Sequence, residues 1–449
     1  MEPSVIPRSE HIISRKAISP NALRILYKLR HHGFIAYLVG GCVRDLLLGR
    51  VPKDFDVVTD ATPGQIKRLF RNCRLIGRRF RLAHLHFENE IIEVATFRRS
   101  AHATPEEEQD LPIPEHHHMK DTHGMILRDN LFGTPQQDAL SRDFTINALF
   151  YNIADFSIID YSGGISDLNQ GIIRPIGDPL VRFTEDPVRM LRAVRFAASH
   201  SFDIEPAAWE AIRDISHFLS RIDTSRLYEE VQKTFLSGAA APGFAILDQS
   251  GLLSSMFPQL QRWVYARQEN KLIVQRNLEY LDQISQSDDR STAAVLLAAL
   301  LGPLTEEQSL VLKHEGVPYQ AAVIKTCENQ IELVRTRMNV PKRISAQFRA
   351  LLVLQGSLRR IPPKRASVLL QKPEFHDALC YLRMMSRFKK DNLEAVNWWN
   401  KYSSSLSKPG LNDSQSEEYS KKRKRRKRHR KRTRSQSHNV EATASGKEA

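Results

Sequence analysis

The sequence predicts an α+β fold with a small head built on a mixed sheet, an all-α neck and body, and a disordered basic C-terminal tail. Short helical and strand-like segments alternate early in the chain, whereas helical periodicity dominates for about two hundred residues after Asp186. A chain of 449 residues is too long for one hydrophobic core, so we expect several domains. The predicted divisions are a leader (1–19), the head (20–180), the neck (181–245), the body (246–402) and the tail (403–449).

The positive charge of the chain is concentrated in that tail. Of a formal net charge of +15, 12 positive charges lie between Lys421 and Arg434, a run without acids, so the rest of the chain carries only +3. Such a run is typical of sequence-independent attraction to nucleic-acid phosphates. A solubilising tail or a contact for acidic proteins has the same composition.

The composition also argues against several classes of protein. The cysteines are scattered and form no CxxC pair, so neither a zinc site nor a disulfide framework is expected. No apolar run approaches the length of a membrane span, and the N-terminus has no signal-like apolar segment. We therefore expect a cytoplasmic protein with reduced cysteines. These are Cys42, Cys73, Cys327 and Cys380.

Local signals predict each element of the head. Apolar residues at helical spacing precede Gly33, a strand runs into the glycine pair, and Gly49 ends a short second helix. Two later apolar runs flank an acidic turn and predict a hairpin, although that turn lacks glycine. The predicted elements are helix Pro20–His32, strand Phe34–Val39, helix Val43–Leu48, strand Asp54–Val58, helix Pro63–Phe70, and a hairpin of Leu82–Phe87 with Ile91–Phe97.

The segment Ser100–Gly124 interrupts the pattern with three prolines, an acidic cluster and five histidines, and we interpret it as a mobile loop. The consecutive histidines His116–His118 cannot all face one ion in regular structure, so a solvated loop is preferred to a metal site. Tandem amphipathic helices follow. They are Ala207–Leu219, Ser225–Leu236, Ser291–Leu301, Ala321–Met338, Ile344–Gln355 and Pro373–Met385.

The strongest chemical signal lies between Gly40 and Asp56. The pair Gly40-Gly41 allows close approach of the backbone to a triphosphate and leaves the next N–H groups available to anions. Alternate side chains of a strand share a face, so Asp54 and Asp56 are expected to project side by side. Adjacent carboxylates repel unless a cation lies between them, and Mg²⁺, or Mn²⁺ in its place, suits oxygen ligands. Two such ions are the usual machinery of phosphoryl transfer, which indicates a nucleotidyltransferase.

Two arginines are candidate ligands of the triphosphate. Arg44 lies about one helical turn after the glycine pair and Arg142 begins a second polar cluster; either guanidinium suits bidentate binding of phosphate. A salt bridge to Asp45 is the alternative for Arg44.

A third carboxylate has two candidates. Asp143 could orient one of these arginines, complete the acidic site, or cap a helix over Phe144–Phe150. Glu93 is the alternative, since an acid within an apolar strand is costly unless it is paired, metal-bound or exposed on one sheet face.

A third cluster begins at Asp186-Pro187, a strong helix start. Arg189, Arg192 and Arg195 follow at three-residue intervals. By themselves these arginines are typical of a basic surface helix, but they could also present hydrogen-bond donors to an incoming base. Adenine and cytosine both show a donor beside an acceptor, so such residues reject G and U without choosing between A and C. Pocket size must make that choice.

Together these segments resemble a known family. LVGGCVRDLLLG, KDFDVVTDATP, RDFTINALFYN and EDPVRMLRAVRFAA look like the class II tRNA nucleotidyltransferase and bacterial poly(A) polymerase family of the polymerase β-like superfamily. Gly77–His84, Ile126–Asn130 and the N-terminal IPRSEHIISRKAISPNALRILYKL are similar to its poly(A) polymerase branch. The resemblance covers residues 6–400 and is most specific in the first half.

The resemblance implies a reaction. An RNA 3′-hydroxyl attacks the α-phosphate of ATP and releases pyrophosphate, without a template, giving poly(A) tails that take part in RNA turnover. The helical half would cradle the RNA 3′ end, and the tail would add phosphate contacts; protein partners are not indicated. The implied roles are metal binding for Asp54 and Asp56, triphosphate contact for Gly41, Arg44 and Arg142, an active-site position for Asp143, and nucleotide contact for Arg189 and Arg192.

Two other functions remain open on the sequence. CCA addition to tRNA, which needs CTP and ATP, shares the motifs, and only the resemblance at Gly77–His84 argues against it. A catalytically inert RNA-binding protein would keep the fold, but the intact Asp54 and Asp56 argue against that, because an unused acidic pair contributes only repulsion.

Overall fold

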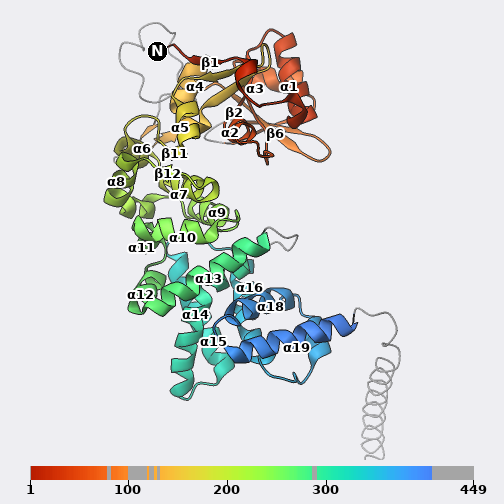
Figure 1. Ribbon diagram of the computed structural model, residues 1–449, viewed down its shortest axis with the longest axis vertical. Helices are drawn as coiled ribbons and strands as arrows, with labels where there is room; N and C mark the ends of the chain where they lie inside the picture. Colours follow the sequence, from red (N-terminus) through yellow and green to blue (C-terminus); the bar gives the residue numbers. More distant parts are fainter. Residues whose placement is uncertain are drawn as a thin grey trace, which may run out of the picture. The chain divides into compact units, whose positions relative to one another are not determined.

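An eight-stranded mixed sheet lies at the centre of the head (Figure 1). The structure is a computed structural model, which describes residues 2–77, 82–99, 119–120, 126–128, 132–285 and 291–406. The strand order is β1-β10-β9-β2-β3-β6-β5-β4; β3 and β6 are parallel and the other neighbours antiparallel. This arrangement confirms the predicted mixed sheet. The strands are β1 (Ser4–Ile6), β2 (Ala36–Val39), β3 (Asp56–Thr59), β4 (Cys73–Ile76), β5 (Leu82–His86), β6 (Ile91–Thr96), β9 (Leu149–Asn152) and β10 (Ile158–Asp160).

The register of the central strands brings acidic residues together. Val39 pairs with Asp56 on one side and with Phe150 on the other, and Asp56 pairs in turn with Glu93. Residues directly opposite each other in neighbouring strands point to the same face of a sheet. Asp56 and Glu93 therefore share the face that carries Phe150.

Helices pack against the strands of the sheet. Helix α1 (Pro20–His31) packs against β2 and β3, α2 (Gly41–Leu47) against β2 and β9, and α3 (Pro63–Leu69) against β4 and β5. Helix α4 (Pro135–Ser141) contributes Ala139 to a buried cluster that contains Val39 and Phe150. It therefore lies over the face of the sheet that carries Asp56. Helix α5 (Gly164–Gln170) completes the head.

The helix at Pro20, the hairpin β5–β6 and the helix at Pro63 confirm the sequence predictions within one residue. The predicted strand Asp54–Val58 is partly wrong, because β3 begins at Asp56. After α2 the chain turns at Gly49 (φ 68°) and reaches sheet pairing only where Asp56 meets Val39. Asp54 consequently lies in the bend before the strand and does not alternate with Asp56 along it.

The alternative in which Asp143 caps a helix over Phe144–Phe150 is also wrong. A short 3₁₀ turn, Thr145–Asn147, is followed directly by β9. Strand β9 lies between β2 and β10 in the sheet. The hydrogen bonds that it forms with both neighbours override a local helical tendency. The carboxylate of Asp143 nevertheless accepts a hydrogen bond from the Phe144 N–H at 2.9 Å.

Part of the predicted loop Ser100–Gly124 is a strand: β7 (Met119–Lys120) pairs with β8 (Ile126–Arg128). The rest of that loop, with His116–His118, lies outside the described residues, as do positions 78–81 of the Gly77–His84 segment, 129–130 and the basic tail after Leu406.

The chain after the head is helical, as predicted, apart from the two-residue strand β12 (Asp203–Ile204), which pairs in parallel with β11 (Ile172–Ile173) at the end of the head. The helix boundaries agree with the predictions within a few residues except at α14, which continues well beyond Leu301. The helices are α6 (Pro179–Glu185), α7 (Val188–His200), α8 (Pro206–Ile215), α9 (Thr224–Phe235), α10 (Ala240–Gln249), α11 (Leu252–Met256), α12 (Pro258–Ala266), α13 (Gln268–Ser285), α14 (Ala293–His314), α15 (Tyr319–Arg335), α16 (Lys342–Leu358), α17 (Ala366–Leu370), α18 (Phe375–Met385) and α19 (Lys390–Leu406).

Helix α14 has the length and apolar composition of a membrane span, but 72% of its most apolar window is buried inside the protein. Within the described ranges it is the one helix with that composition. Burial of this extent is typical of a core helix.

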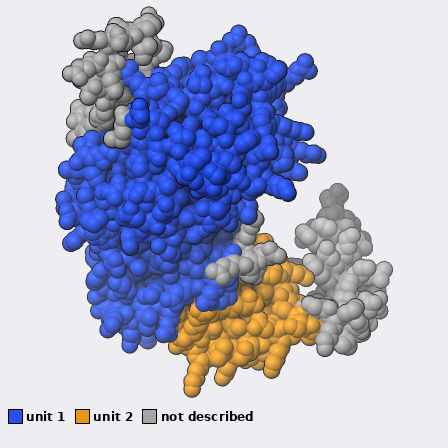
Figure 2. Space-filling view, turned by 45° about the horizontal axis from the view of Figure 1, so that its top comes forward, with its two compact units in different colours: residues 1–353 blue, residues 354–449 orange. Residues whose placement is uncertain are grey.

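The chain divides into two compact units, residues 1–353 and 354–449 (Figure 2). In the second unit, Trp399 is fully buried, packs edge-on against Phe375 with ring centroids 5.1 Å apart, and donates from Nε1 to the Leu358 carbonyl at 3.0 Å. Helix α19 ends at Leu406, four residues past the predicted end of the body at 402. The division into leader, head, neck and body stays a prediction.

Candidate active site

The glycine turn between β2 and α2 brings two guanidinium groups next to the backbone. Gly40 has φ 77° and ψ −137°, a region that side-chain-bearing residues rarely adopt. A Cβ at Gly40 would lie 3.4 Å from Nη1 of Arg142, and a Cβ at Gly41 would lie 3.5 Å from Nη2 of Arg44. Because neither glycine carries a side chain, a ligand that reaches this turn meets backbone and both arginines together.

Asp56 lies at the start of β3 among other acids. Burial, the negative charge of Glu93 and that of Asp54 raise its pKa from 3.8 to about 6, against the opposing effect of Arg142. Desolvation and like charges both disfavour the ionised form of a carboxyl group. The negative charges around the Asp56 carboxylate therefore outweigh the positive charge of Arg142. Perturbation of this kind is common at functional sites.

Of the two candidates for a third carboxylate, Glu93 is the one beside Asp56. It is the direct register partner of Asp56, its side chain is 48% exposed, and its Oε1 lies 3.3 Å from Nε2 of His84. The exposure explains how an acid is tolerated in this apolar strand. Within the described ranges, no group of three or more His, Cys, Asp and Glu converges closely enough to enclose a metal by itself.

Asp143 has a different environment. Its carboxylate accepts hydrogen bonds from Nε of Arg192 at 2.6 Å and from Nδ2 of Asn147 at 3.1 Å. Burial alone would raise its pKa, but the charge of Arg192 and these hydrogen bonds lower it to about 2. Asp143 is thus charged at neutral pH and anchors an arginine, and its side chain contacts Arg192 and Asn147, not Asp56.

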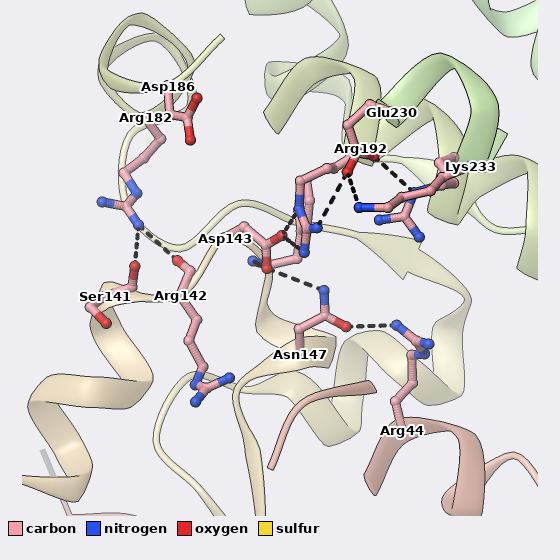
Figure 3. A network of polar contacts seen from close by, with 12 residues as sticks. Arg44, Ser141, Arg142, Asp143, Asn147, Arg182, Asp186, Arg192, Glu230 and Lys233 are labelled. Carbon is pink, nitrogen blue, oxygen red and sulfur yellow. Dashed lines mark hydrogen bonds and ion pairs between the residues drawn. The ribbon is translucent and has the colours of Figure 1, made fainter. Parts of the chain in front are cut away.

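Asn147 connects Asp143 to the glycine turn (Figure 3). Its Oδ1 accepts from Nη1 of Arg44 at 2.7 Å while its Nδ2 donates to Asp143. A guanidinium only donates and a carboxylate only accepts, so one orientation of the amide satisfies both neighbours. A continuous polar path therefore runs from α2 in the head to Arg192 on α7.

Arg44 also donates to its neighbour Asp45, from Nε at 2.9 Å and from Nη2 at 2.7 Å. This is the salt bridge considered as an alternative from the sequence. Burial opposes ionisation of Asp45, but the contacts with His200 and Arg44 lower its pKa. Arg44 also lies over the ring of Phe196 on α7, 5.0 Å from its centroid. Three of its five N–H groups are used, which leaves the second hydrogen on each Nη.

Arg142 is held by Asp138 of α4, which accepts from its Nε at 3.0 Å and its Nη2 at 2.8 Å. The third nitrogen, Nη1, is the atom next to Gly40. The carbonyl of Arg142 accepts from Nη2 of Arg182 at 2.7 Å, as Figure 3 shows. Burial and the charge of Arg189 lower the pKa of Arg182 to about 10. Arg142 is therefore clamped from two sides, with one edge of its guanidinium toward the glycine turn.

Each arginine of α7 contacts at least one acid, and Arg192 and Arg195 share Glu230. Arg189 contacts Glu185 at 3.2 Å, whereas Arg192 contacts Asp143 at 2.6 Å and Glu230 of α9 at 4.0 Å. Arg195 contacts Glu230 at 3.1 Å. Beside them lies a cavity of about 340 Å³, large enough for a heterocyclic base. It is lined by Asp143, Asp186, Val188, Arg189, Arg192, Arg226, Glu229, Glu230 and Lys233.

The structure thus brings the predicted residues into two groups. One group surrounds the glycine turn and β3, and the other surrounds the cavity at α7. Sequence reasoning missed Asp138, Asn147 and Glu230, which hold the arginines. The only available signal was a polar residue inside an apolar run, such as Asn147 between Ile146 and Ala148.

A small mixed sheet whose glycine turn and clustered carboxylates face a set of arginines defines a nucleotidyltransferase. Comparison with known proteins gives the same class. Family models match residues 36–174 (poly A polymerase head domain), 201–264 (probable RNA and SrmB- binding site of polymerase A) and 315–434 (polymerase A arginine-rich C-terminus). The chain belongs to the bacterial poly(A) polymerase family.

Individual relatives agree. The chain is 40% identical over 407 residues to poly(A) polymerase I of Salmonella typhimurium, which covers 90% of this chain and 86% of the relative. It is 36% identical over 231 residues to a CCA-adding enzyme of Lactobacillus johnsonii, covering only 51% of this chain and 54% of the relative. The CCA-adding enzyme of Bacillus stearothermophilus, solved with CTP, has the same fold, with a TM-score of 0.60 and 23% identity over 87% of this chain and 84% of that one. Enzymes of this family use divalent metals.

Proposed function

We propose that the enzyme adds AMP from ATP to RNA 3′-hydroxyl ends without a template, building poly(A). The observation that carries the chemistry is the carboxylate of Asp56, which pairs in register with Glu93 and whose pKa is raised by burial and by the charges of Glu93 and Asp54, against the effect of Arg142. The sequence match to poly(A) polymerase I of Salmonella typhimurium extends over 90% of the chain, whereas the sequence match to the CCA-adding enzyme of Lactobacillus johnsonii covers 51% of it. The extent of the match supports poly(A) synthesis over CCA addition.

The residues suit a divalent cation. Mg²⁺ is usually held by one or two carboxylates with waters and substrate phosphates completing its shell, so the lack of a closed protein cage among the described residues is compatible with it. Asp54 and Asp56 would hold Mg²⁺, or Mn²⁺, with Glu93 as the third carboxylate. The bound ions would lower the pKa of the attacking hydroxyl and neutralise charge on the leaving group.

The arginines would position the nucleotide. Nη1 of Arg142, beside Gly40, and the unused Nη hydrogens of Arg44 are donors suited to triphosphate oxygens, with Gly41 at the start of α2. Arg189 and Arg192 would contact the base, each held by an acid. Because these acids restrict the arginines before ligand binding, little side-chain entropy remains to be lost when the nucleotide binds.

RNA would be bound along the helical part of the chain. The family model for RNA binding covers residues 201–264, and the arginine-rich model covers 315–434 and thus includes the basic run. Phosphate contacts of the tail would add affinity that falls steeply with salt. We place the reaction in the cytoplasm; three of the four cysteines are buried, and none of the four forms a disulfide.

The test is extension of two labelled RNAs with Mg²⁺ and each nucleoside triphosphate, alone and together. One RNA is a generic oligomer with a 3′-hydroxyl and the other a tRNA lacking its CCA end. Long products on both RNAs with ATP alone are expected. Addition of three nucleotides that requires CTP and occurs only on the tRNA would overturn the proposal in favour of CCA addition. RNA binding without extension would identify an inert RNA-binding protein.

A further inference from the structure

The N-terminal leader, which the proposed reaction does not use, forms a second cavity on the head. The cavity has a volume of about 510 Å³, within the range of small-ligand sites. It is lined by Arg8, Ser14, Arg15, Lys16, Leu23, Tyr27, Tyr151 and Phe156.

The fold fixes the leader in place. Strand β1, labelled at the top of the head in Figure 1, is the edge strand of the sheet and pairs with β10. The side chain of His11 forms a hydrogen bond at 2.8 Å with the carbonyl of Phe156 in the β9–β10 turn. Ile13 and Ile18 are only 1% and 3% exposed. The walls of the cavity are therefore parts of the folded head.

This cavity lies on the other side of the sheet from the carboxylates. Tyr151 of β9 pairs with Leu38, and its neighbour Phe150 pairs with Val39, the partner of Asp56. Successive residues of a strand point to opposite faces, so Tyr151 faces away from Asp56. A ligand in this cavity cannot be the reacting nucleotide.

Three cations at the cavity lack acidic partners. Among the described residues, Arg8, Arg15 and Lys16 form no ion pair; Arg8 donates to the His11 carbonyl at 2.8 Å, and Arg15 to the Tyr27 hydroxyl at 3.2 Å. In the active site, by contrast, Arg44, Arg142, Arg189 and Arg192 each contact an Asp or Glu. The cavity lining contains no acid. Uncompensated charge of this kind suits an anion.

The aromatic residues point to an anion that carries a base. Phe156 adopts φ 64°, an uncommon conformation for a bulky residue, and its ring lies 4.8 Å from the Arg15 guanidinium. Tyr27 is 41% exposed at the rim. Tyr151 is fully buried, and its hydroxyl has no hydrogen-bond partner among the described residues. A buried polar group without a partner costs free energy that a ligand can recover.

We propose that this cavity binds a phosphorylated nucleoside, with the phosphate at Arg8, Arg15 and Lys16 and the base against Tyr27 and Phe156. Its source is either a nucleotide of the RNA strand away from the 3′ end or a free nucleotide. The RNA source rests on the proposed function, because it takes RNA as the substrate. Stacking of bases on aromatic rings combined with basic side chains is the general mode of single-strand binding.

The test measures binding without catalysis, in the full chain without ATP or divalent metal. Fluorescence anisotropy with labelled oligo(A) at several salt concentrations is compared for wild type, R15A/K16A, F156L and K67A/R68A. The last is a matched control, because Lys67 and Arg68 are an exposed Lys–Arg pair on α3. Titration calorimetry with AMP covers the free nucleotide. Thermal unfolding verifies that F156L, which keeps an apolar side chain, is folded.

For an RNA strand, R15A/K16A should weaken oligo(A) binding and flatten the slope of log affinity against log salt by about 1.4, from about 0.7 per lost phosphate contact. F156L should weaken binding about fivefold or more through lost stacking. For a free nucleotide, R15A/K16A should remove one AMP site and leave oligo(A) binding intact. Either result supports the site. Equal losses in K67A/R68A, or no change in both measurements, would overturn it. None of these binding measurements depends on extension activity. They therefore test the cavity even if the enzyme does not extend RNA.

Discussion

Replacing Asp56 by Asn should stabilise the metal-free protein while abolishing activity. The pKa of Asp56 lies at about 6 instead of 3.8, so its ionisation is disfavoured in the folded state. This rise in pKa corresponds to a loss of up to about 3 kcal/mol in the free energy of unfolding. Solvent screening at this half-buried group reduces the loss to about 1–2 kcal/mol. Asn keeps the shape and removes the charge.

The sign follows from proton linkage. A carboxyl group whose pKa is raised by folding lowers stability as pH rises from about 4 to 6, and the full penalty remains above 6. The melting temperature of D56N should therefore exceed that of wild type at pH 8 in EDTA by a few degrees, and the difference should vanish near pH 4. Exposed Asp214 on α8 serves as a control, because D214N should change neither value.

Magnesium should raise the melting temperature of wild type relative to that of D56N. Mg²⁺ at millimolar concentration should raise the melting temperature of wild type at pH 8, since a ligand that binds the native state stabilises it, and should leave D56N unchanged. RNA binding should persist in D56N while extension is lost. If D56N melts below wild type at pH 8 in EDTA, the carboxylate is not destabilised by Glu93 and Asp54, and the reasoning is refuted.

Two other substitutions test the polar network between Arg44 and Arg192, and a third tests the acids around Asp56. D143N should destabilise the protein at neutral pH by about 2 kcal/mol, because it removes the carboxylate 2.6 Å from Arg192 and leaves that arginine only its 4.0 Å contact with Glu230. Because the pKa of Asp143 is lowered to about 2, the difference in melting temperature from wild type should shrink as pH falls from 4 toward 2; a constant difference would contradict the assignment. N147L should cost about 1–3 kcal/mol in urea unfolding and raise KM for ATP, whereas an unchanged KM would remove the bridge from nucleotide binding. E93Q should move the acid limb of the pH–rate profile to lower pH, because the pKa of Asp56 falls toward its ordinary value, while E88Q in the exposed hairpin turn should leave that limb in place.

The sequence was sufficient for the order and type of most elements. The helix at Pro20 has a proline at N1 and a Ser19 cap that accepts from two backbone N–H groups, both local features. The hairpin of β5 and β6 follows from alternating apolar residues. Such elements are predictable because the residues that specify them are neighbours in the chain.

Elements defined by distant partners were predicted less well. Residues 149–152 form a strand because β2 and β10 lie on either side, a condition that local propensity does not contain. The start of β3 is set by the pairing of Asp56 with Val39, and this moves Asp54 out of the strand.

For the site, the sequence by itself determined the residue types: the glycine pair, Asp54 and Asp56, and the arginines of three motifs. Only the tertiary structure decided their division of labour. It placed Glu93 beside Asp56 through a parallel strand pair, and it separated Asp143 from them by pairing it with Arg192. The physical reason is that charge interactions depend on distance and burial, which are properties of the packed chain and not of spacing along it.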